Sequence, residues 1–182
     1  GSGKSTVCRV FAMLGAAVYD SDREARRLMN RDPQLIMRIN SLFGPEAYRD
    51  GELNRSYVAA AVFNDPALLA QLNGIVHPAV AADFQQWSLQ QHAPYVIEES
   101  AILFEAGADR QMDATVAVVA PEELRIRRTC LRDGTDETAV RARIARQMGD
   151  EERVSRADHV LIADESRLLI PQIIELHNLF IR

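Results

Sequence analysis

The stretch Gly-Ser-Gly-Lys-Ser-Thr at residues 1–6 runs directly into a helical pattern at residues 7–14. Apolar side chains recur there at the spacing of one helix face, at Val7, Val10, Phe11 and Leu14. Gly15 follows at the point where such a helix would end. A glycine-rich turn that opens into a helix presents backbone N–H groups and the positive end of the helix dipole to one spot. This stretch therefore predicts an anion-binding loop.

Short strands alternate with helices along the rest of the chain. The predicted strands are residues 16–19, 95–97, 114–120 and 159–163. The run at 114–120 is continuous and rich in β-branched residues, as the strands of parallel sheets are. This alternation predicts an α/β fold with an open parallel sheet and right-handed crossovers. With a first strand that is expected before residue 1 and is absent from this chain, the sheet would have five strands.

The segment between the first two of these strands is polar and helical in pattern. Turn-forming breaks interrupt it at Asp32-Pro33, Gly44-Pro45, Asp50-Gly51, Asp65-Pro66 and His77-Pro78. About seventy residues are too many for a simple crossover. We therefore predict a helical, substrate-binding subdomain at residues 23–92, with residues 1–22 and 93–182 forming the core.

The composition limits the class of protein. A net charge of −5 argues against nucleic acid as the main partner, and the longest apolar runs are too short to span a bilayer. Two cysteines, Cys8 and Cys130, cannot build a disulfide framework, which favours a reduced, cytoplasmic compartment. Of the 21 basic residues only Lys4 is a lysine. The chain thus keeps one compact ammonium, which around phosphate is not interchangeable with a guanidinium.

The first six residues match the second half of a phosphate-binding pattern. The full pattern is Gly, four residues, then Gly-Lys-Ser/Thr, so its first glycine would precede residue 1. Lys4 would bridge the β- and γ-phosphates of a nucleotide, and the Ser5 hydroxyl would hold Mg²⁺. The alternative is that residues 1–3 are an artificial leader. The helix that follows and the lone lysine favour the nucleotide site.

Asp20 and Asp22 follow a predicted strand, at the edge where the ligands of open sheets bind. Two carboxylates two residues apart suit metal coordination or the removal of a proton from an acceptor hydroxyl. They equally suit a helix N-cap and a first-turn acid. The residues alone leave both interpretations open.

Arginines gather on two predicted helices, one that begins after Pro121 and one over residues 137–147, joined by the Asp133-Gly134 turn. They are Arg125, Arg127, Arg128, Arg132, Arg141, Arg143 and Arg146. A solvated charged face explains most such runs, and the alternative is a lid that neutralises charge on a transferred phosphoryl group. Neighbouring acids would pair with some of these arginines, namely Glu122, Glu123, Asp133, Asp136 and Glu137. An amphipathic helix over 167–180 closes the chain, with Pro171 near its first turn.

Two further residues have open roles. Glu99 ends a predicted strand, roughly where a phosphate-loop protein keeps its second metal-binding carboxylate. His77 lies in the helical insert, where a lone histidine is more often structural than catalytic.

These motifs, in this order, resemble the dephospho-coenzyme A kinase family over nearly the whole chain. The matching stretches are residues 1–6, 19–22, 51–55, 62–66, 72–78, 102–105, 127–133 and 143–147. Many proteins share the phosphate loop, whereas the Asp-x-Asp, Leu-Asn-Arg and Val-His-Pro elements are more specific. The chain departs from the family at Glu99-Ser-Ala-Ile-Leu103, where many members have Asp-x-Pro-Leu-Leu, and at residues 162–166, which lack the usual asparagine.

The resemblance implies transfer of phosphate from ATP, with Mg²⁺, to the ribose 3′-hydroxyl of dephospho-CoA, the last step of coenzyme A synthesis. It implies the five-stranded parallel sheet of a P-loop kinase, a helical acceptor-binding insert and a helical lid at about 122–150, in a monomer whose partner is the small-molecule acceptor. The implied catalytic residues are Asp22 as base, Lys4, Arg132 and Arg143. The implied ATP-binding residues are Gly1, Ser2, Gly3, Lys4, Ser5, Thr6 and Arg128, with Ser5 on the metal. The implied acceptor-site residues are Asp20, Arg55, His77 and Glu99.

Three rival interpretations remain. A kinase for another small acceptor, such as a nucleoside monophosphate, is disfavoured by the order of the insert motifs. A nucleotide-driven switch without an acceptor leaves the large helical insert without a purpose. A chain that binds nucleotide but does not turn over is the third.

Overall fold

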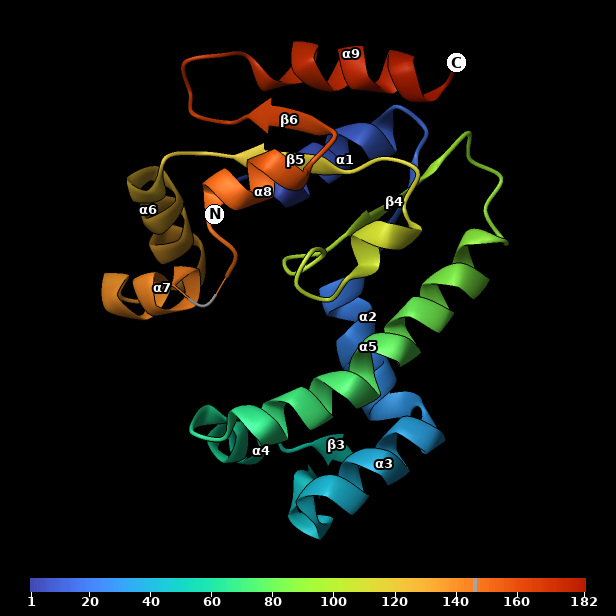
Figure 1. Cartoon of the computed structure of the whole chain (residues 1–182), viewed down its shortest axis with the longest axis vertical. Helices are drawn as coiled ribbons and strands as arrows, with labels where there is room; N and C mark the ends of the chain where they lie inside the picture. Colours follow the sequence, from blue (N-terminus) through green and yellow to red (C-terminus); the bar gives the residue numbers. More distant parts are fainter. Residues whose placement is uncertain (146) are drawn as a thin grey trace. The chain divides into compact units, whose positions relative to one another are not determined.

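The computed structural model describes residues 1–145 and 147–182 (Figure 1). Its residues divide into two compact units, Gly1–Val18 with His92–Arg182, and Tyr19–Gln91. The sequence placed the boundaries after residues 22 and 92, so Asp20 and Asp22 fall in the second unit and not in the predicted core. The reason is Tyr19, whose hydroxyl and ring contact α5 (Pro66–Ser88) of that unit.

The first unit is built on parallel strands and two covering helices. Strand β5 (Val116–Val119) pairs in parallel with β6 (His159–Ile162), Val116 lying opposite His159 and Val119 opposite Ile162. Helix α9 (Leu169–Phe180) packs against β6 and against α1 (Lys4–Met13). Pro171 falls in the first turn of α9, as predicted, where its missing N–H costs nothing.

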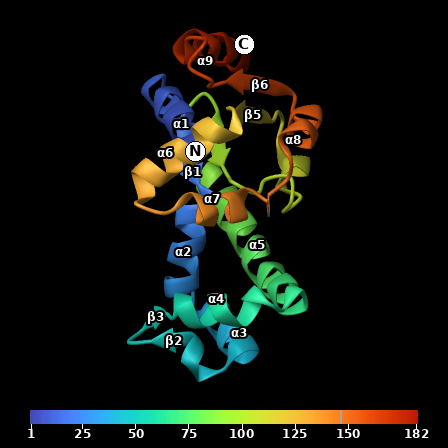
Figure 2. The same ribbon diagram turned by 90° about the vertical axis from the view of Figure 1, so that its left-hand side faces the viewer.

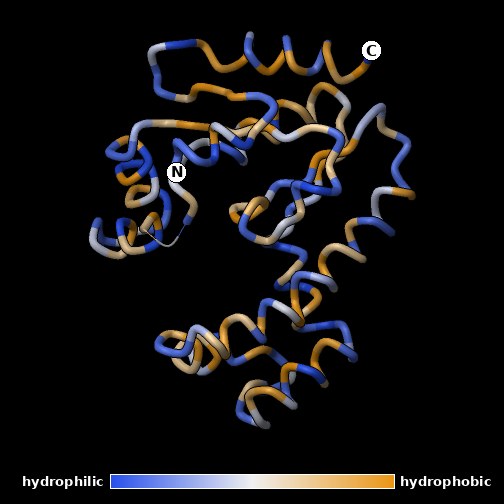
Figure 3. Tube along the Cα trace, in the orientation of Figure 1, coloured by the Kyte–Doolittle hydropathy of each residue, from blue (hydrophilic) through white to orange (hydrophobic). Residues whose placement is uncertain are grey.

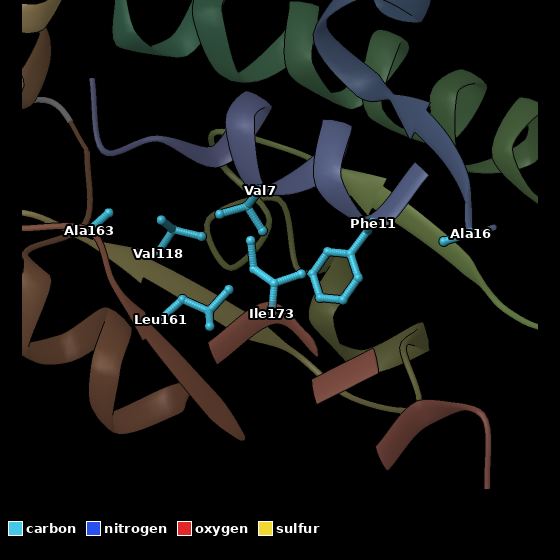
Figure 4. Packing of buried hydrophobic residues seen from close by; sticks show 7 residues of the cluster. All are labelled: Val7, Phe11, Ala16, Val118, Leu161, Ala163 and Ile173. Atoms are coloured by element: carbon cyan, nitrogen blue, oxygen red, sulfur yellow. The ribbon is translucent and has the colours of Figure 1, made fainter. Parts of the chain in front are cut away.

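The core of this unit lies between these elements. Val7 and Phe11, four residues apart on α1, meet Val118 of β5, Leu161 of β6 and Ile173 of α9 (Figure 4). Phe11 is 2% exposed and Ile173 is fully buried. The apolar face that the sequence predicted for the first helix is therefore the face that attaches it to the strands.

Strand β1 (Ala17–Asp20) and β4 (Val96–Glu99) form a second two-stranded sheet, and the Ala17 amide donates to the Tyr95 carbonyl at 3.3 Å. Each predicted strand is present within two residues of its expected limits. The single five-stranded sheet is not confirmed, because the described residues form separate pairs.

The two Arg-rich helices predicted after β5 are present, and a third helix follows them. Gly134, at a φ of 63°, ends α6 (Glu122–Asp133), and the Asp136 carboxylate caps α7 (Glu137–Ile144) by accepting from the Ala139 amide. The second helix was predicted to reach residue 147, but it ends at Ile144. A further helix, α8 (Asp150–Arg156), was not predicted, and its acid-rich first turn is the signal that was missed. A short 3₁₀ turn, η2 (Ala108–Gln111), precedes β5.

The second unit is helical. It contains α2 (Ser21–Arg31), α3 (Pro33–Phe43), α4 (Arg55–Phe63) and α5, with α2, α3 and α4 each packed on α5. The breaks predicted at Asp32-Pro33 and Asp65-Pro66 are helix starts, since each aspartate caps the helix whose first residue is the proline.

A small hairpin was not predicted. Strands β2 (Tyr48–Arg49) and β3 (Glu52–Leu53) pair antiparallel after the 3₁₀ turn η1 (Pro45–Ala47) (Figure 2). Asp50 and Gly51 connect them with φ values of 52° and 80°, as a two-residue primed turn requires. The Asp50-Gly51 break was therefore correct, and the strands on either side of it were too short to recognise.

The break predicted at His77-Pro78 is wrong, because α5 continues through Pro78 to Ser88. Val76 and Val80 flank the proline and are buried at 8% and 9% exposure. Packing of this face on the neighbouring helices outweighs the lost backbone hydrogen bond.

Hydrophobic and hydrophilic residues are interspersed along the helices (Figure 3). Over residues 1–145 and 147–182, no helix combines the length and the apolar character needed to cross a membrane.

Candidate functional site

The loop at residues 1–6 leads into α1 with the geometry of an anion site. Gly3 is the N-cap of α1 at a φ of 102°, which favours glycine, and its carbonyl accepts from the amides of Thr6 and Val7 at 3.0 Å. The amides of Lys4 and Ser5, which precede these two, have no acceptor within the helix. They face outward from its N-terminus together with the positive end of the dipole.

Gly1 packs closely on α6. A Cβ at Gly1 would overlap the Arg125 carbonyl oxygen and lie 2.6 Å from the Thr129 hydroxyl, so only glycine fits there. Ser2 is buried at 8% exposure. This packing makes residues 1–3 an integrated part of the unit.

Lys4 is the first residue of α1 and is partly buried. No carboxylate of the described residues lies within ion-pair distance of its ammonium. Most arginines of the same unit, by contrast, have carboxylate partners. Lys4 is therefore a cation that is available to a bound anion.

Ser5 and Glu99 meet although they are far apart in sequence. The Ser5 hydroxyl donates to the Glu99 carboxylate at 2.7 Å, which joins the start of α1 to the end of β4. The two side chains that the sequence associated with a metal are thus adjacent. The described residues hold no cluster of three His, Cys, Asp or Glu side chains suited to a metal ion.

The predicted pairing of arginines with neighbouring acids is confirmed. Arg132 donates to Asp133 at 2.7 Å, and Arg143 lies 3.5 Å from the other oxygen of the same carboxylate. The hydrogen bond from Arg132 lowers the pKa of Asp133 below its usual range. Arg141 contacts Glu122, Glu123 and Glu137 and so ties α7 to the start of α6. Arg146 lies outside the described residues.

Arg128 reaches the loop after β6. It donates to the Ala163 carbonyl and to the Glu165 carboxylate, both at 3.0 Å, and Ala163 itself lies beside Gly3 of the anion-binding loop. Glu165 also pairs with Arg127 and has a φ of 69°, in the left-handed region. The sequence did not single out Glu165, because nothing in its neighbourhood indicates a turn that favours glycine.

Asp20 and Asp22 lie at the start of α2 in the second unit. The Asp20 carboxylate accepts from the Arg23 amide at 2.9 Å, so the helix-cap interpretation of Asp20 is confirmed. Asp22 is in the first turn of α2 and is exposed. No basic side chain of the described residues pairs with it, which leaves its carboxylate open to a substrate.

Arg55 and His77 are in the same unit. Arg55 is the first residue of α4, exposed, and none of the described carboxylates pairs with it. His77 lies in the middle of α5, partly buried, and this burial lowers the pKa of its imidazole. A neutral imidazole can both donate and accept a hydrogen bond.

The comparisons with known proteins agree with one another. The family model for dephospho-CoA kinase matches residues 1–168. A Bacteroides fragilis protein named dephospho-CoA kinase is 40% identical over 177 residues, covering 97% of this chain and 86% of the relative. A Salinibacter ruber protein of the same name is 43% identical over 168 residues, covering 90% of this chain and 84% of the relative.

Solved structures extend the likeness to the fold. A Thermus thermophilus crystal structure superposes with a TM-score of 0.88 at 34% identity, covering 100% of this chain and 93% of that one. A dephospho-CoA kinase from Campylobacter jejuni gives a TM-score of 0.64 at 23% identity, covering 97% and 90%, and supports the fold alone. The match of the family model across both units, together with relatives at about 40% identity, shows that this chain belongs to the dephospho-CoA kinase family.

Proposed function

We propose that the chain phosphorylates the ribose 3′-hydroxyl of dephospho-CoA with ATP and so produces coenzyme A. The observation that carries this proposal is Lys4 at the start of α1, which forms no ion pair with the described carboxylates, in a chain of this family. In P-loop enzymes a lysine at this position neutralises charge on the β- and γ-phosphates, and little covalent chemistry is asked of the protein.

On the ATP side, residues 1–6 would hold the phosphates through their backbone amides and Lys4. Arg128 would serve the same nucleotide, because its guanidinium lies on the Ala163 carbonyl next to Gly3. Arg132 and Arg143 would neutralise charge that develops on the transferred phosphoryl group. Both now lie on Asp133, from which the phosphates would displace them. Residues 122–150 would form the lid.

The residues present fit Mg²⁺. A hydroxyl and a carboxylate in contact, Ser5 and Glu99, are the hard oxygen ligands that this ion prefers, and two protein oxygens suit an ion that takes its other ligands from phosphate and water. Ser5 would be the direct ligand and Glu99 its partner; the ion supplies charge neutralisation to the phosphates when bound.

On the acceptor side, Asp22 would accept the proton of the attacking hydroxyl. Its carboxylate is exposed, and none of the described cationic side chains pairs with it. A general base needs this accessibility to reach the proton that it accepts. Asp20 would fix the turn that carries it. Arg55, an exposed cation, and His77 would bind the acceptor, which makes Tyr19–Gln91 the acceptor-binding subdomain.

We also propose that the two strand pairs belong to one five-stranded parallel sheet. Residues from β5 and β6 pack in one core with Ala16, which directly precedes β1, and with Ile97 of β4, which supports a common layer. The strand expected before residue 1 would be the fifth.

The remaining parts of the proposal concern the cellular compartment, the partners and the oligomeric state. Two cysteines, Cys8 and Cys130, cannot build a disulfide framework, which supports a reduced, cytoplasmic compartment. The net charge of −5 supports a protein that does not act on nucleic acid or on membranes. We propose a monomer.

A coupled assay across acceptors tests the function. We expect ADP release from MgATP with dephospho-CoA, and none with nucleoside monophosphates or without acceptor. Mass spectrometry should place the new phosphate on the ribose. Turnover without acceptor would instead favour a nucleotide-driven switch, and turnover with a nucleoside monophosphate would favour another kinase.

Asp22→Asn tests the base. We expect kcat to fall by about 10²–10⁴-fold, the usual contribution of a general base, with ATP affinity unchanged. Asp32→Asn is the matched control, because it makes the same change at a helix cap where asparagine is equally suitable. Near-normal kcat in Asp22→Asn would remove Asp22 as base.

A further inference from the structure

Asp83 of α5 receives two hydrogen bonds from the segment that carries Asp20 and Asp22. The Tyr19 hydroxyl donates to one carboxylate oxygen at 2.7 Å, and the Arg27 guanidinium donates to the other at 2.7 Å. Tyr19 directly precedes Asp20, and Arg27 lies five residues beyond Asp22 on α2. The Asp83 carboxylate is therefore hydrogen-bonded to a residue before Asp20 and to a residue after Asp22.

This contact is well enclosed on the tyrosine side. Tyr19 is 2% exposed, and its ring lies 5.3 Å from the rings of both Phe84 and Trp87 on α5. Burial, followed by the bond to Asp83, raises the pKa of Tyr19, so the hydroxyl remains a donor at all working pH values. The ring packing fixes where the hydroxyl lies, and the hydroxyl in turn fixes the carboxylate.

On the Arg27 side, a series of hydrogen bonds runs along α2. Arg27 also donates to Glu24, and the other oxygen of Glu24 accepts from Arg23 at 2.9 Å. Arg23 is the residue whose amide is capped by Asp20. The chain of contacts thus runs from Asp83 through Arg27 and Glu24 back to the first turn of α2, where Asp22 lies.

We propose that Asp83 is a positioning residue for Asp22, acting through the Tyr19 hydroxyl and through Arg27. The inference rests on the proposed role of Asp22 as base. Asp22 is exposed in the first turn of α2, and no described side chain forms an ion pair or hydrogen bond with its carboxylate, so the orientation of α2 must set the direction of this group. Proton transfer requires that direction to be held within a fraction of an ångström, and misplacement is costly in rate.

If the hydrogen bond between Tyr19 and Asp83 were purely structural, its loss would have a different effect. Phenylalanine in place of Tyr19 would keep the ring packing against Phe84 and Trp87 and would lose the hydroxyl alone. If the contact served stability only, that change would lower stability without a specific loss of turnover. The two roles are therefore separable in one variant.

Tyr19→Phe is the test, and Tyr57→Phe is its matched control. The Tyr57 hydroxyl donates to the Phe43 carbonyl at 3.0 Å in the same unit, so the control also deletes one tyrosine hydrogen bond but touches neither α2 nor Asp83. We expect Tyr19→Phe to lower kcat by roughly tenfold or more, with the KM for ATP within about twofold of the wild type. The control should keep kcat near the wild-type value at a similar loss of stability. Equal kcat values in the two variants would overturn the inference.

Substitutions of Asp83 supply a rescue series. Asp83→Asn keeps an oxygen for the Tyr19 hydroxyl and loses the charge that holds Arg27, whereas Asp83→Ala loses both. We expect kcat to fall in the order wild type, Asp83→Asn, Asp83→Ala. If Asp83→Ala does not fold, Asp83→Asn and Tyr19→Phe decide, and an Asp83→Asn enzyme with wild-type kcat would contradict the role of Arg27.

Amide hydrogen exchange gives a measurement that needs no acceptor. Protection of the Arg23 amide, which donates to Asp20, should fall in Tyr19→Phe and stay unchanged in Tyr57→Phe. Unchanged protection in both would overturn the positioning inference whatever the enzyme does. A wild-type chain that leaves dephospho-CoA unmodified would instead overturn the proposed function, while the exchange result would still judge the link from Tyr19 to the aspartate turn.

Discussion

His77 makes the stability of the chain depend on pH. Burial lowers the pKa of its imidazole below the usual value of about 6.5, so the unfolded chain binds the proton more readily than the folded chain. Stability therefore falls as the pH drops through 6.5 toward the lowered folded-state pKa. Above the usual value both states are neutral and this contribution is complete.

We expect the advantage of wild type over His77→Gln, measured as the free energy of unfolding in urea, to be larger at pH 8 than at pH 5. His92→Gln is the control, since His92 is exposed and is the residue at which the chain re-enters the first unit. An advantage over His77→Gln that is constant across this range would show that burial does not perturb the imidazole.

Single residues were predicted unevenly. A motif and a strand end mark Lys4, Ser5 and Glu99 as candidates in the sequence, and the structure brings Ser5 and Glu99 together. Asp20 shows why chemistry and structure are not exclusive: it caps α2, as the structural interpretation predicted, and still holds the turn that carries Asp22. Asp83 could not be found, because its partner Tyr19 is 64 residues away and no local pattern joins them.

At the scale of elements, Asp133 links two helices by holding Arg132 of α6 and Arg143 of α7. A bound triphosphate would compete with this carboxylate for both guanidinium groups. Asp133→Asn should therefore tighten ATP binding, by about two- to fivefold if the exposed pairs have ordinary strength. Calorimetric titration with MgATP measures it.

Asp136→Asn is the matched control for that titration. It removes the same charge from the same segment but leaves the arginines paired, and asparagine still caps α7. Raising the salt concentration should shrink any general charge effect that the two variants share. Equal affinities in both variants would show that Asp133 does not restrain the arginines.

Elements were predictable where a cap or a turn residue marked them. Asp32, Asp65 and Asp136 each begin a helix, and Gly134 ends one. Local rules failed where packing decided the outcome. Pro78 lies within α5 because Val76 and Val80 on either side of it are buried, and a sequence pattern does not reveal which helices press on that face.

For the whole molecule, the alternation of strands and helices was enough to predict an α/β core with a helical insert. It could not fix where the units divide. That limit depends on the hydroxyl and ring contacts of Tyr19, which draw the end of β1 into the helical unit. The pairing of β1 with β4 and of β5 with β6 also depends on contacts between distant segments.

Division into two compact units predicts that ligands stabilise them separately. The chain passes between the units only twice, after Val18 and after Gln91. Trp87 is the one tryptophan, it packs on Tyr19 and Phe84, and its fluorescence therefore reports on the second unit. Circular dichroism reports on the helices of both.

A ligand stabilises the unit that binds it by about 2.7 kcal/mol at a hundred times its Kd. If ATP binds at residues 1–6 and the acceptor at the helical unit, MgATP should raise the unfolding midpoint seen by circular dichroism and leave the Trp87 transition nearly in place. Dephospho-CoA should move the Trp87 transition. Coincident transitions that both ligands shift equally would mean that the two units unfold as one cooperative structure, because separate units cannot share a ligand's binding energy.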